Sequence, residues 1–396
     1  MVVNGPRQSG KTALLRMLQA GRGGEYVSLD SSSALAAARA DPTGFVTGFG
    51  EPLLIDEVQR GGDPLVTAVK LAVDGSQRRG QFVLAGSTRF LTEPRLSESL
   101  VGRARIVDLW PLSQGEIDST PDGFVDLAFR SPETIAESVH PVPGRHEIME
   151  RVCRGGFPEA VRNPSARDRR GFLIDYARAI AQRDVRELAD LEHAVQVRGL
   201  LRLLAARTAQ EVHLADLARD LAIPAPTLRR YLPLFETLYV HHLIPAWSVS
   251  AAARTIRRPK LHVVDSGLAA ALLGLDADAL ARPTTTIAGQ LLESFVAGEL
   301  ARQLTWSDTD AALHHWRDRD GNEVDLVVES ADGRVVAIEV KAAVDVHDRD
   351  FSGIRALQRR IGDRLILGVL LHCGERPRSF GPSLVAAPVS ALWLAG

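Results

Sequence analysis

The chain has 396 residues, of which 45% are hydrophobic and 24% are charged, and its formal net charge is −2. This composition is typical of a folded globular protein of two to four domains, and it excludes a disordered, fibrous or uniformly basic chain. Two cysteines exclude a disulfide framework, which favours a reducing, cytoplasmic location, and no apolar run reaches the ~18 residues of a membrane helix, so no membrane partner is expected.

The first 110 residues alternate short apolar runs with amphipathic or Ala-rich stretches. This alternation predicts an α/β domain with a doubly wound parallel sheet, because strands that are buried on both faces read as continuous apolar runs. The predicted strands are residues 1–4, 25–29, 52–56, 81–85 and 105–109.

Strand signals become rare between residues 126 and 282, where Leu, Ala and Arg dominate, as in 177–194 and 199–221. We expect this middle part to be helical. A turn-like stretch at 282–289 predicts a linker, and the residues after it predict a second α/β unit. Its expected elements are helices at 290–304 and 351–361 and strands at 312–316, 323–329, 335–341 and 365–372.

A glycine-rich loop follows the first predicted strand and precedes a helical stretch. It matches the pattern G-x-x-x-x-G-K-[ST] and consists of Gly5, Pro6, Arg7, Gln8, Ser9, Gly10, Lys11 and Thr12. In such a loop, backbone N–H groups surround phosphate oxygens at a helix N-terminus, the lysine reaches the β- and γ-phosphates and the hydroxyl binds Mg²⁺. The loop therefore predicts a site for a nucleoside triphosphate with Mg²⁺.

Two carboxylates, Asp56 and Glu57, follow the apolar run of the third predicted strand. We expect Asp56 to hold Mg²⁺ and Glu57 to polarise the attacking water, which predicts hydrolysis as well as binding, although alone the pair could simply begin a loop. Ser87 and Thr88 end the fourth strand and are expected to sense the γ-phosphate. Arg103 is expected either to stabilise the transition state or to be a solvated surface arginine.

These motifs lie in the segments GPRQSGKTALL, LLIDEVQR, FVLAGSTRF and SLVGRARIVDLWPLSQGE, and RGGFPEAV and RDV (183–185) follow them. In order and spacing the chain resembles ATPases of the AAA superfamily from bacteria and archaea that carry a C-terminal domain of unknown function. The resemblance implies ATP and Mg²⁺ as ligands. Because AAA-type sites often use an arginine from a neighbouring subunit, it also makes a homo-oligomer an expectation.

The start of the chain departs from this family pattern. Relatives usually have a few tens of residues before the phosphate-binding strand, whereas here that strand begins almost at Met1. We expect either that the true start lies upstream or that the first helix of the fold is absent.

A candidate DNA-binding region lies in the middle of the chain. Residues 214–221 and 226–238, joined by a tight turn, have helix-turn-helix proportions, and the apolar runs 239–244 and 261–264 could form a wing. Residues 223–262 carry one acidic residue and six basic ones, and we expect these six to contact DNA: Arg229, Arg230, Arg254, Arg257, Arg258 and Lys260. The alternative is that the winged helix is a packing module.

The predicted C-terminal strands carry a second set of chemical groups. Strand period two places Glu339 and Lys341 on one face, and the neighbouring strand can bring Asp325 beside them. We expect Asp325 and Glu339, together with Glu293 from the preceding helix, to bind Mg²⁺, and Lys341 to activate water against a phosphodiester. Lys341 is one of only four lysines among 47 basic residues, which favours a chemical role.

A helix carrying Glu, a strand carrying Asp and a following strand carrying Glu-x-Lys resemble the restriction-endonuclease-like superfamily. The resemblance implies a nuclease-like α/β fold, which is either active or retained as a binding module.

The predicted organisation leads to one leading interpretation and one alternative. The chain is expected to comprise an AAA-type P-loop domain (1–125), a helical region (126–209), a winged-helix-like part (210–265), a helix with a linker (266–288) and a restriction-endonuclease-like domain (289–396). The leading interpretation is an ATPase that acts on DNA and whose ATP turnover gates the nuclease-like domain. The alternative is a nucleotide-switched interaction or DNA-binding regulatory protein in which that domain is inactive.

Overall fold

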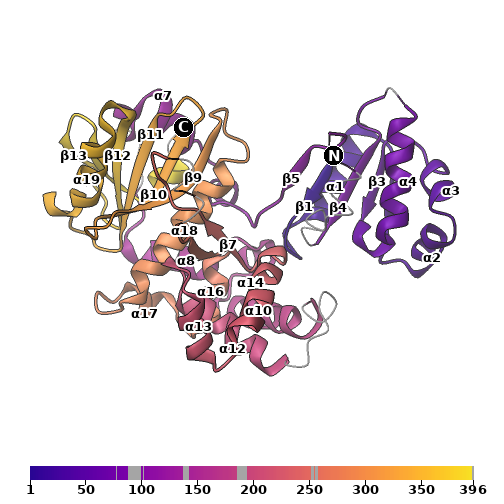
Figure 1. Ribbon diagram of the computed structural model, residues 1–396, viewed down its shortest axis with the longest axis horizontal. Coiled ribbons are helices and arrows are strands. Elements are labelled where there is room, and N and C mark those ends of the chain that lie inside the picture. Colours follow the sequence, from indigo (N-terminus) through magenta and orange to yellow (C-terminus); the bar gives the residue numbers. More distant parts are fainter. Residues whose placement is uncertain are drawn as a thin grey trace. The chain divides into compact units, whose positions relative to one another are not determined.

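A computed structural model describes residues 1–76, 78–87, 100, 102–136, 142–184, 194–250, 254 and 257–394. The chain divides into two compact units (Figure 1). Unit 1 comprises Met1–Pro111 with Thr237–Tyr239, and unit 2 comprises Leu112–Glu236 with Val240–Gly396. The predicted linker 282–289 lies within unit 2, where one helix ends at Ala281 and the next begins at Ile287.

Unit 1 contains a five-stranded sheet in the order β2-β3-β4-β1-β5, and all of its strand pairs are parallel. The elements are β1 (Val2–Asn4), α1 (Lys11–Arg22), β2 (Glu25–Ser28), α2 (Ser32–Ala40), α3 (Pro42–Thr47), β3 (Leu53–Asp56), α4 (Gly62–Asp74), β4 (Phe82–Gly86) and β5 (Ile106–Asp108). The parallel sheet predicted for the N-terminal part is therefore confirmed, with every strand within one or two residues of its expected bounds.

Helices cover both faces of this sheet. Leu15 of α1 packs with Val3, Leu54 and Ala85 on one face. The other face packs against α2, α3 and α4, and Leu65 belongs to that core. Successive strand residues point to opposite faces, so a strand that is covered on both sides must be apolar throughout. This layering leaves the carboxyl ends of β1, β3 and β4 on one common edge of the sheet.

Unit 2 contains a six-stranded mixed sheet in the order β13-β14-β12-β11-β10-β9. Its C-terminal elements are α18 (Ile287–Gln303), β9 (Ala311–Arg317), β10 (Glu323–Ser330), β11 (Val335–Lys341), α19 (Ser352–Ile361), β12 (Leu365–His372), β13 (Arg378–Gly381), β14 (Leu384–Pro388) and α20 (Ala391–Leu394). Helix α18 packs on one face of the sheet and α19 on the other. Since other helices pack against α18 as well, Leu291, Leu292, Phe295 and Val296 are all buried.

The rest of unit 2 is mainly helical, as expected. Its elements are α6 (Gln114–Asp118), α7 (Phe124–Arg130), α8 (Arg145–Arg154), α9 (Pro158–Arg162), α10 (Ala166–Ala179), α12 (Ala194–Ala206), β6 (Gln210–Glu211), α13 (Leu214–Leu221), α14 (Ala225–Thr237), β7 (His241–Ile244), β8 (Lys260–Val263), α16 (Ser266–Leu273) and α17 (Ala277–Ala281). Strands β6, β8 and β7 form a small antiparallel sheet in that order.

Parts of two expectations lie outside the described residues, namely the end of the helical stretch 177–194 and the last residue of the RDV segment. Among the described helices, none combines the length and the apolar character that crossing a membrane requires.

Candidate functional site

The glycine-rich loop connects β1 to α1 at the carboxyl edge of the unit 1 sheet. Gly10 precedes α1 with a φ of 102°, which favours glycine because other residues carry a Cβ that clashes there. Gly5 cannot carry a side chain either, since a Cβ at this position would lie 2.3 Å from the Leu109 carbonyl oxygen. Both glycines therefore have a steric reason to be where they are, independent of any ligand.

Lys11 folds back over this loop. Its ammonium donates hydrogen bonds to the carbonyl oxygens of Gly5 (2.9 Å) and Pro6 (2.6 Å). Burial lowers the pKa of Lys11 to about 8, although the nearby carboxylates of Glu57 and Asp56 oppose that shift. Lys11 is therefore a partly desolvated cation held at the loop, which is the kind of group that attracts a phosphate.

Thr12 and Asp56 meet directly, as a shared metal role would require. The Thr12 hydroxyl donates a 2.7 Å hydrogen bond to an Asp56 carboxylate oxygen across 44 residues of sequence. The same oxygen accepts a 3.0 Å hydrogen bond from the Tyr26 hydroxyl. Sequence reasoning missed Tyr26, because no motif marks a side chain in the middle of β2.

Glu57 lies at a strained position directly after β3, with a φ of 53°. Its carboxylate accepts hydrogen bonds from the Gln59 amide and from the Ser87 hydroxyl (3.1 Å), and the Gln59 amide also donates to Ser87 (3.0 Å). The structure thus brings the predicted base and the predicted sensor together through Gln59, which the sequence did not single out. Thr88, the second predicted hydroxyl, lies outside the described residues.

The other predicted residues of this site differ in their burial and in their contacts. Ser9 is buried, and its hydroxyl has no hydrogen-bond partner among the described residues, whereas Arg7 is half-buried and Gln8 is exposed. Arg103 forms an exposed ion pair with Asp74 at the end of α4.

A second cluster lies in unit 2, where β8, β10, β11 and α18 meet. Lys260 of β8 is 3% exposed and lies 2.9 Å from Glu293 and 3.5 Å from Asp325. It also forms an ion pair with Glu323. Burial alone would lower the pKa of Lys260, but the three carboxylates raise it. One buried ammonium therefore compensates three acidic side chains.

Asp325, Glu339 and Lys341 also lie close together, as the strand register predicts. Asp325 accepts a 2.9 Å hydrogen bond from the backbone N–H of Val340, and the Lys341 ammonium lies 2.7 Å from Glu339. Burial and the neighbouring Asp325 carboxylate raise the pKa of Glu339 to about 8. Within the described part of the chain, no three His, Cys, Asp or Glu side chains are arranged to hold a metal ion. The carboxylates of Glu293 and Asp325 contact Lys260 instead.

The six predicted DNA-contact residues do not form one exposed patch. The prediction that Lys260 contacts DNA is wrong, because this lysine is buried among carboxylates and cannot present its charge at the surface. Arg254 is half-buried, lies over the Trp247 ring and pairs with both oxygens of Glu329 at 2.6 and 3.0 Å. Its charge is therefore largely compensated within unit 2.

The remaining four arginines are more accessible. Arg229 and Arg230 are exposed on α14. Arg258 is exposed and donates to the His213 ring, and the half-buried Arg257 donates to the Arg317 carbonyl oxygen. An anionic partner could reach these groups without breaking a carboxylate ion pair that the structure describes.

Comparisons with known proteins match three successive parts of the chain. Residues 1–118 match the family model of an AAA domain, and residues 145–279 and 288–392 match two domains of unknown function, DUF8612 and DUF4143. The uncharacterized proteins Rv2008c of Mycobacterium tuberculosis and Mb2031c of Mycobacterium bovis are each 29% identical to the chain. These matches cover 100% of this chain and 81% of each relative.

The comparison with solved structures finds the RuvB Holliday junction branch migration motor of Thermotoga maritima. It is 20% identical with a TM-score of 0.29, over 62% of this chain and 81% of that chain, and such a TM-score is too low to support an inference. The family match and the geometry of the glycine-rich loop agree for the N-terminal part. Residues 1–118 therefore resemble an AAA domain, and their glycine-rich loop has the sequence pattern of a P-loop.

Proposed function

We propose that this protein binds and hydrolyses ATP with Mg²⁺ and that ATP turnover controls an action of unit 2 on DNA. The observation that carries the ATPase part is the contact between Thr12 and Asp56, which places a hydroxyl and a carboxylate beside the glycine-rich loop. Hydroxyl and carboxylate oxygens are ligands that Mg²⁺ prefers. The Ser9 hydroxyl, which has no hydrogen-bond partner in the described part of the chain, and the folded-back Lys11 add donors on the same loop.

In this proposal each residue has a distinct task. The loop N–H groups and Lys11 would hold the phosphates after Lys11 exchanges its carbonyl partners for phosphate oxygens, while Thr12 and Asp56 would hold Mg²⁺. The ion would supply charge neutralisation at the β- and γ-phosphates. Glu57 would orient the attacking water and draw its proton, and Gln59 and Ser87 would fix the position of the Glu57 carboxylate.

The ATPase part is tested with the full chain, a Lys11→Ala variant and a Glu57→Gln variant. We expect Mg²⁺-dependent ATP binding by the wild type, loss of binding in Lys11→Ala, and retained binding with at least 100-fold slower hydrolysis in Glu57→Gln. Equilibrium binding of a fluorescent ATP analogue and phosphate release measure the two steps. Equal hydrolysis by Glu57→Gln and wild type would reject the role of Glu57.

The action on DNA is supported by two features of unit 2. Helices α13 and α14, followed by β7 and β8, fit a winged helix, and Arg229, Arg230, Arg257 and Arg258 offer charge for phosphate contacts. The mixed sheet with Asp325, Glu339 and Lys341 at adjacent strand positions fits a restriction-endonuclease-like domain. We infer that this domain cleaves DNA in a manner gated by unit 1.

One observation favours the alternative, in which the nuclease-like domain is inactive and serves as a binding or switching module. Lys260 lies among Glu293, Glu323 and Asp325, so a protein cation already neutralises the carboxylates that would bind Mg²⁺. A metal ion at this place would have to displace that ammonium or share the carboxylates with it.

A nuclease assay distinguishes an active nuclease domain from an inactive binding or switching module. Branched, single-stranded and duplex DNA are incubated with the full chain, ATP and Mg²⁺ or Mn²⁺, and the same preparation is made for Asp325→Ala and Lys341→Ala variants. Cleavage that both variants lose supports an active nuclease. Cleavage at equal rates in all three would identify a contaminant, and absence of cleavage together with ATP-dependent DNA binding would support the switching module.

A further inference from the structure

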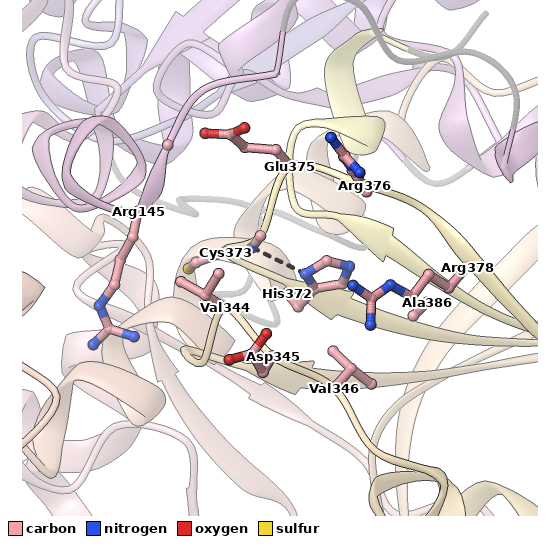
Figure 2. Close-up of a pocket in the computed structure, with 12 residues that line it drawn as sticks. Arg145, Val344, Asp345, Val346, His372, Cys373, Glu375, Arg376, Arg378 and Ala386 are labelled. Carbon is pink, nitrogen blue, oxygen red and sulfur yellow. Dashed lines mark hydrogen bonds between the residues drawn. The ribbon is translucent and has the colours of Figure 1, made fainter.

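A pocket of about 330 Å³ opens within unit 2, beside the carboxyl ends of β11 and β12 (Figure 2). Its lining includes Val344, Asp345, His372, Arg376 and Arg378. The volume is within the range of small-molecule binding sites. Lys341 and His372 are register partners on β11 and β12, so the pocket is adjacent to the second cluster but is formed by different side chains.

His372 is the informative residue of this pocket. It is 3% exposed, and its Nδ1 atom accepts a 2.9 Å hydrogen bond from the backbone N–H of Gly374. A neutral imidazole that accepts at Nδ1 carries its proton on Nε2, so Nε2 is a donor. Burial and the charge of Arg378 lower the pKa of His372 overall, although the backbone of Arg376 and Val344 and the Asp345 carboxylate oppose that shift.

The Nε2 donor of His372 has no hydrogen-bond partner among the described residues. A buried N–H group without an acceptor is costly, so an acceptor from outside the chain would be favoured at this position. A metal ion would not be, because the nitrogen that faces the pocket carries the proton. The chemistry of His372 thus calls for an oxygen-rich ligand.

Two guanidinium groups of the pocket lining also favour a ligand with negatively charged oxygens. In Figure 2 the Arg378 side chain lies beside the His372 ring, Arg376 is drawn farther from the ring on the pocket lining, and Glu375 extends away from it. Both arginines are exposed, and neither forms an ion pair within the described part of the chain. Asp345 lies on another side of the pocket and restricts where an anion can sit.

We propose that this pocket binds a phosphate group, held by the Nε2–H donor of His372 and by the guanidinium groups of Arg376 and Arg378. A guanidinium matches two phosphate oxygens at once, and the imidazole N–H would bind a third. The volume leaves room for the molecule that carries the phosphate. This site is separate from the glycine-rich loop of unit 1, and phosphate binding there does not depend on whether unit 2 cleaves DNA.

The test uses the full chain with Lys11→Ala, so that the glycine-rich loop contributes no phosphate binding. Inorganic phosphate is titrated into this protein by isothermal calorimetry. We expect saturable binding that is at least tenfold weaker after Arg376→Glu with Arg378→Glu. The matched control is Arg359→Glu with Arg360→Glu, two exposed arginines of α19 that do not line the pocket, and it should bind as the parent does.

A His372→Phe variant separates hydrogen bonding from overall charge. It should also bind phosphate at least tenfold more weakly, with circular dichroism confirming that it is folded. Should it not fold, the exposed arginine pair decides the outcome alone. The proposal is overturned if the parent shows no saturable binding, or if the pocket and control double variants bind phosphate equally.

Two further ligands identify the source of the phosphate. Adenosine monophosphate and a 5′-phosphorylated oligonucleotide are compared with the same oligonucleotide lacking the phosphate. Stronger, pocket-dependent binding of the phosphorylated oligonucleotide assigns the site to a nucleic-acid end, and stronger binding of the mononucleotide assigns it to a small molecule; both results support phosphate recognition. Equal binding of the two oligonucleotides in every variant contradicts recognition of a terminal phosphate.

Discussion

The Lys260 ammonium lies 2.9 Å from the Glu293 carboxylate, although the first residue belongs to β8 and the second to α18. Both side chains are buried, and burial raises the pKa of Glu293 well above its ordinary value despite the nearby cation. Glu323 and Asp325 contact the same ammonium. Lys260 therefore links β8 to α18 and β10 within unit 2, and its ammonium occupies the place where a metal ion would contact these carboxylates.

Replacing Lys260 with Met should strongly destabilise unit 2, because three carboxylates would lose their shared buried cation. We expect the free energy of unfolding to fall by about 3–5 kcal/mol, the range for breaking a buried ion pair. Guanidinium denaturation of the full chain measures this change. Arg317→Met is the matched control, since exposed Arg317 approaches the same Glu323 at 3.8 Å and should cost less than about 1 kcal/mol. Equal losses would contradict the role of Lys260.

Replacing Gln59 with Ala should slow ATP hydrolysis without weakening ATP binding. Gln59 contacts the Glu57 carboxylate and the Ser87 hydroxyl, so its loss would misplace the proposed base. We expect kcat to fall about 10- to 100-fold with KM for ATP unchanged, because misplacing a reacting group affects the chemical step. Gln19→Ala, on α1 in the same unit, is the control. A raised KM with unchanged kcat would instead indicate that Gln59 binds the nucleotide.

The fold of unit 1 was predictable because each buried parallel strand leaves a continuous apolar run in the sequence. The short edge strand β13 was not predicted, since Arg378–Gly381 is mostly exposed and carries no such run. Strand β14 (Leu384–Pro388) is fully buried, but it lies beyond the last strand that was expected.

The candidate sites differ in whether their residues are neighbours in the sequence or only in the folded structure. The loop with Lys11 and Thr12 is a local motif, so its position could be read from the sequence. The sequence predicts that Lys260 contacts DNA with the nearby arginines, because only its charge and its place in the chain can be read locally. Its neighbours Glu293 and Asp325 come from distant elements. Only the tertiary structure shows that such a lysine is buried.

Replacing Arg254 with Glu should reduce stability more than DNA affinity. Burial alone would raise the pKa of Glu329, but the hydrogen bonds and charge of Arg254 lower it overall, which shows a tight pair. Loss of these charged hydrogen bonds should cost about 2 kcal/mol. The double variant Arg257→Glu with Arg258→Glu should instead weaken DNA binding and flatten its dependence on salt.

Thermal unfolding and DNA titration at two or more salt concentrations distinguish these variants. A large loss of DNA affinity in folded Arg254→Glu, equal to that of the double variant, would return Arg254 to the set of DNA contacts.

The stability of unit 2 should depend on pH through Glu299 of α18. This carboxylate accepts hydrogen bonds from the Gln114 backbone N–H (2.8 Å) and from Arg302 (3.0 Å), yet burial raises its pKa to about 7 from an ordinary value of 4.5. The folded state therefore holds a proton that the unfolded state releases between pH 4.5 and 7. Because stability falls with rising pH where the folded state binds more protons, this group should destabilise the fold progressively across that interval.

Replacing Glu299 with Gln removes the titrating group and should remove this part of the pH dependence. The difference in unfolding free energy between the variant and the wild type should shift in favour of the variant by about 3 kcal/mol between pH 4.5 and 7. Guanidinium denaturation at several pH values measures the shift independently of any constant cost of leaving Arg302 beside a neutral amide. Glu133→Gln, at an exposed position, serves as the control. If both variants follow the wild-type pH profile, Glu299 is ionised throughout and its hydrogen bonds outweigh its burial.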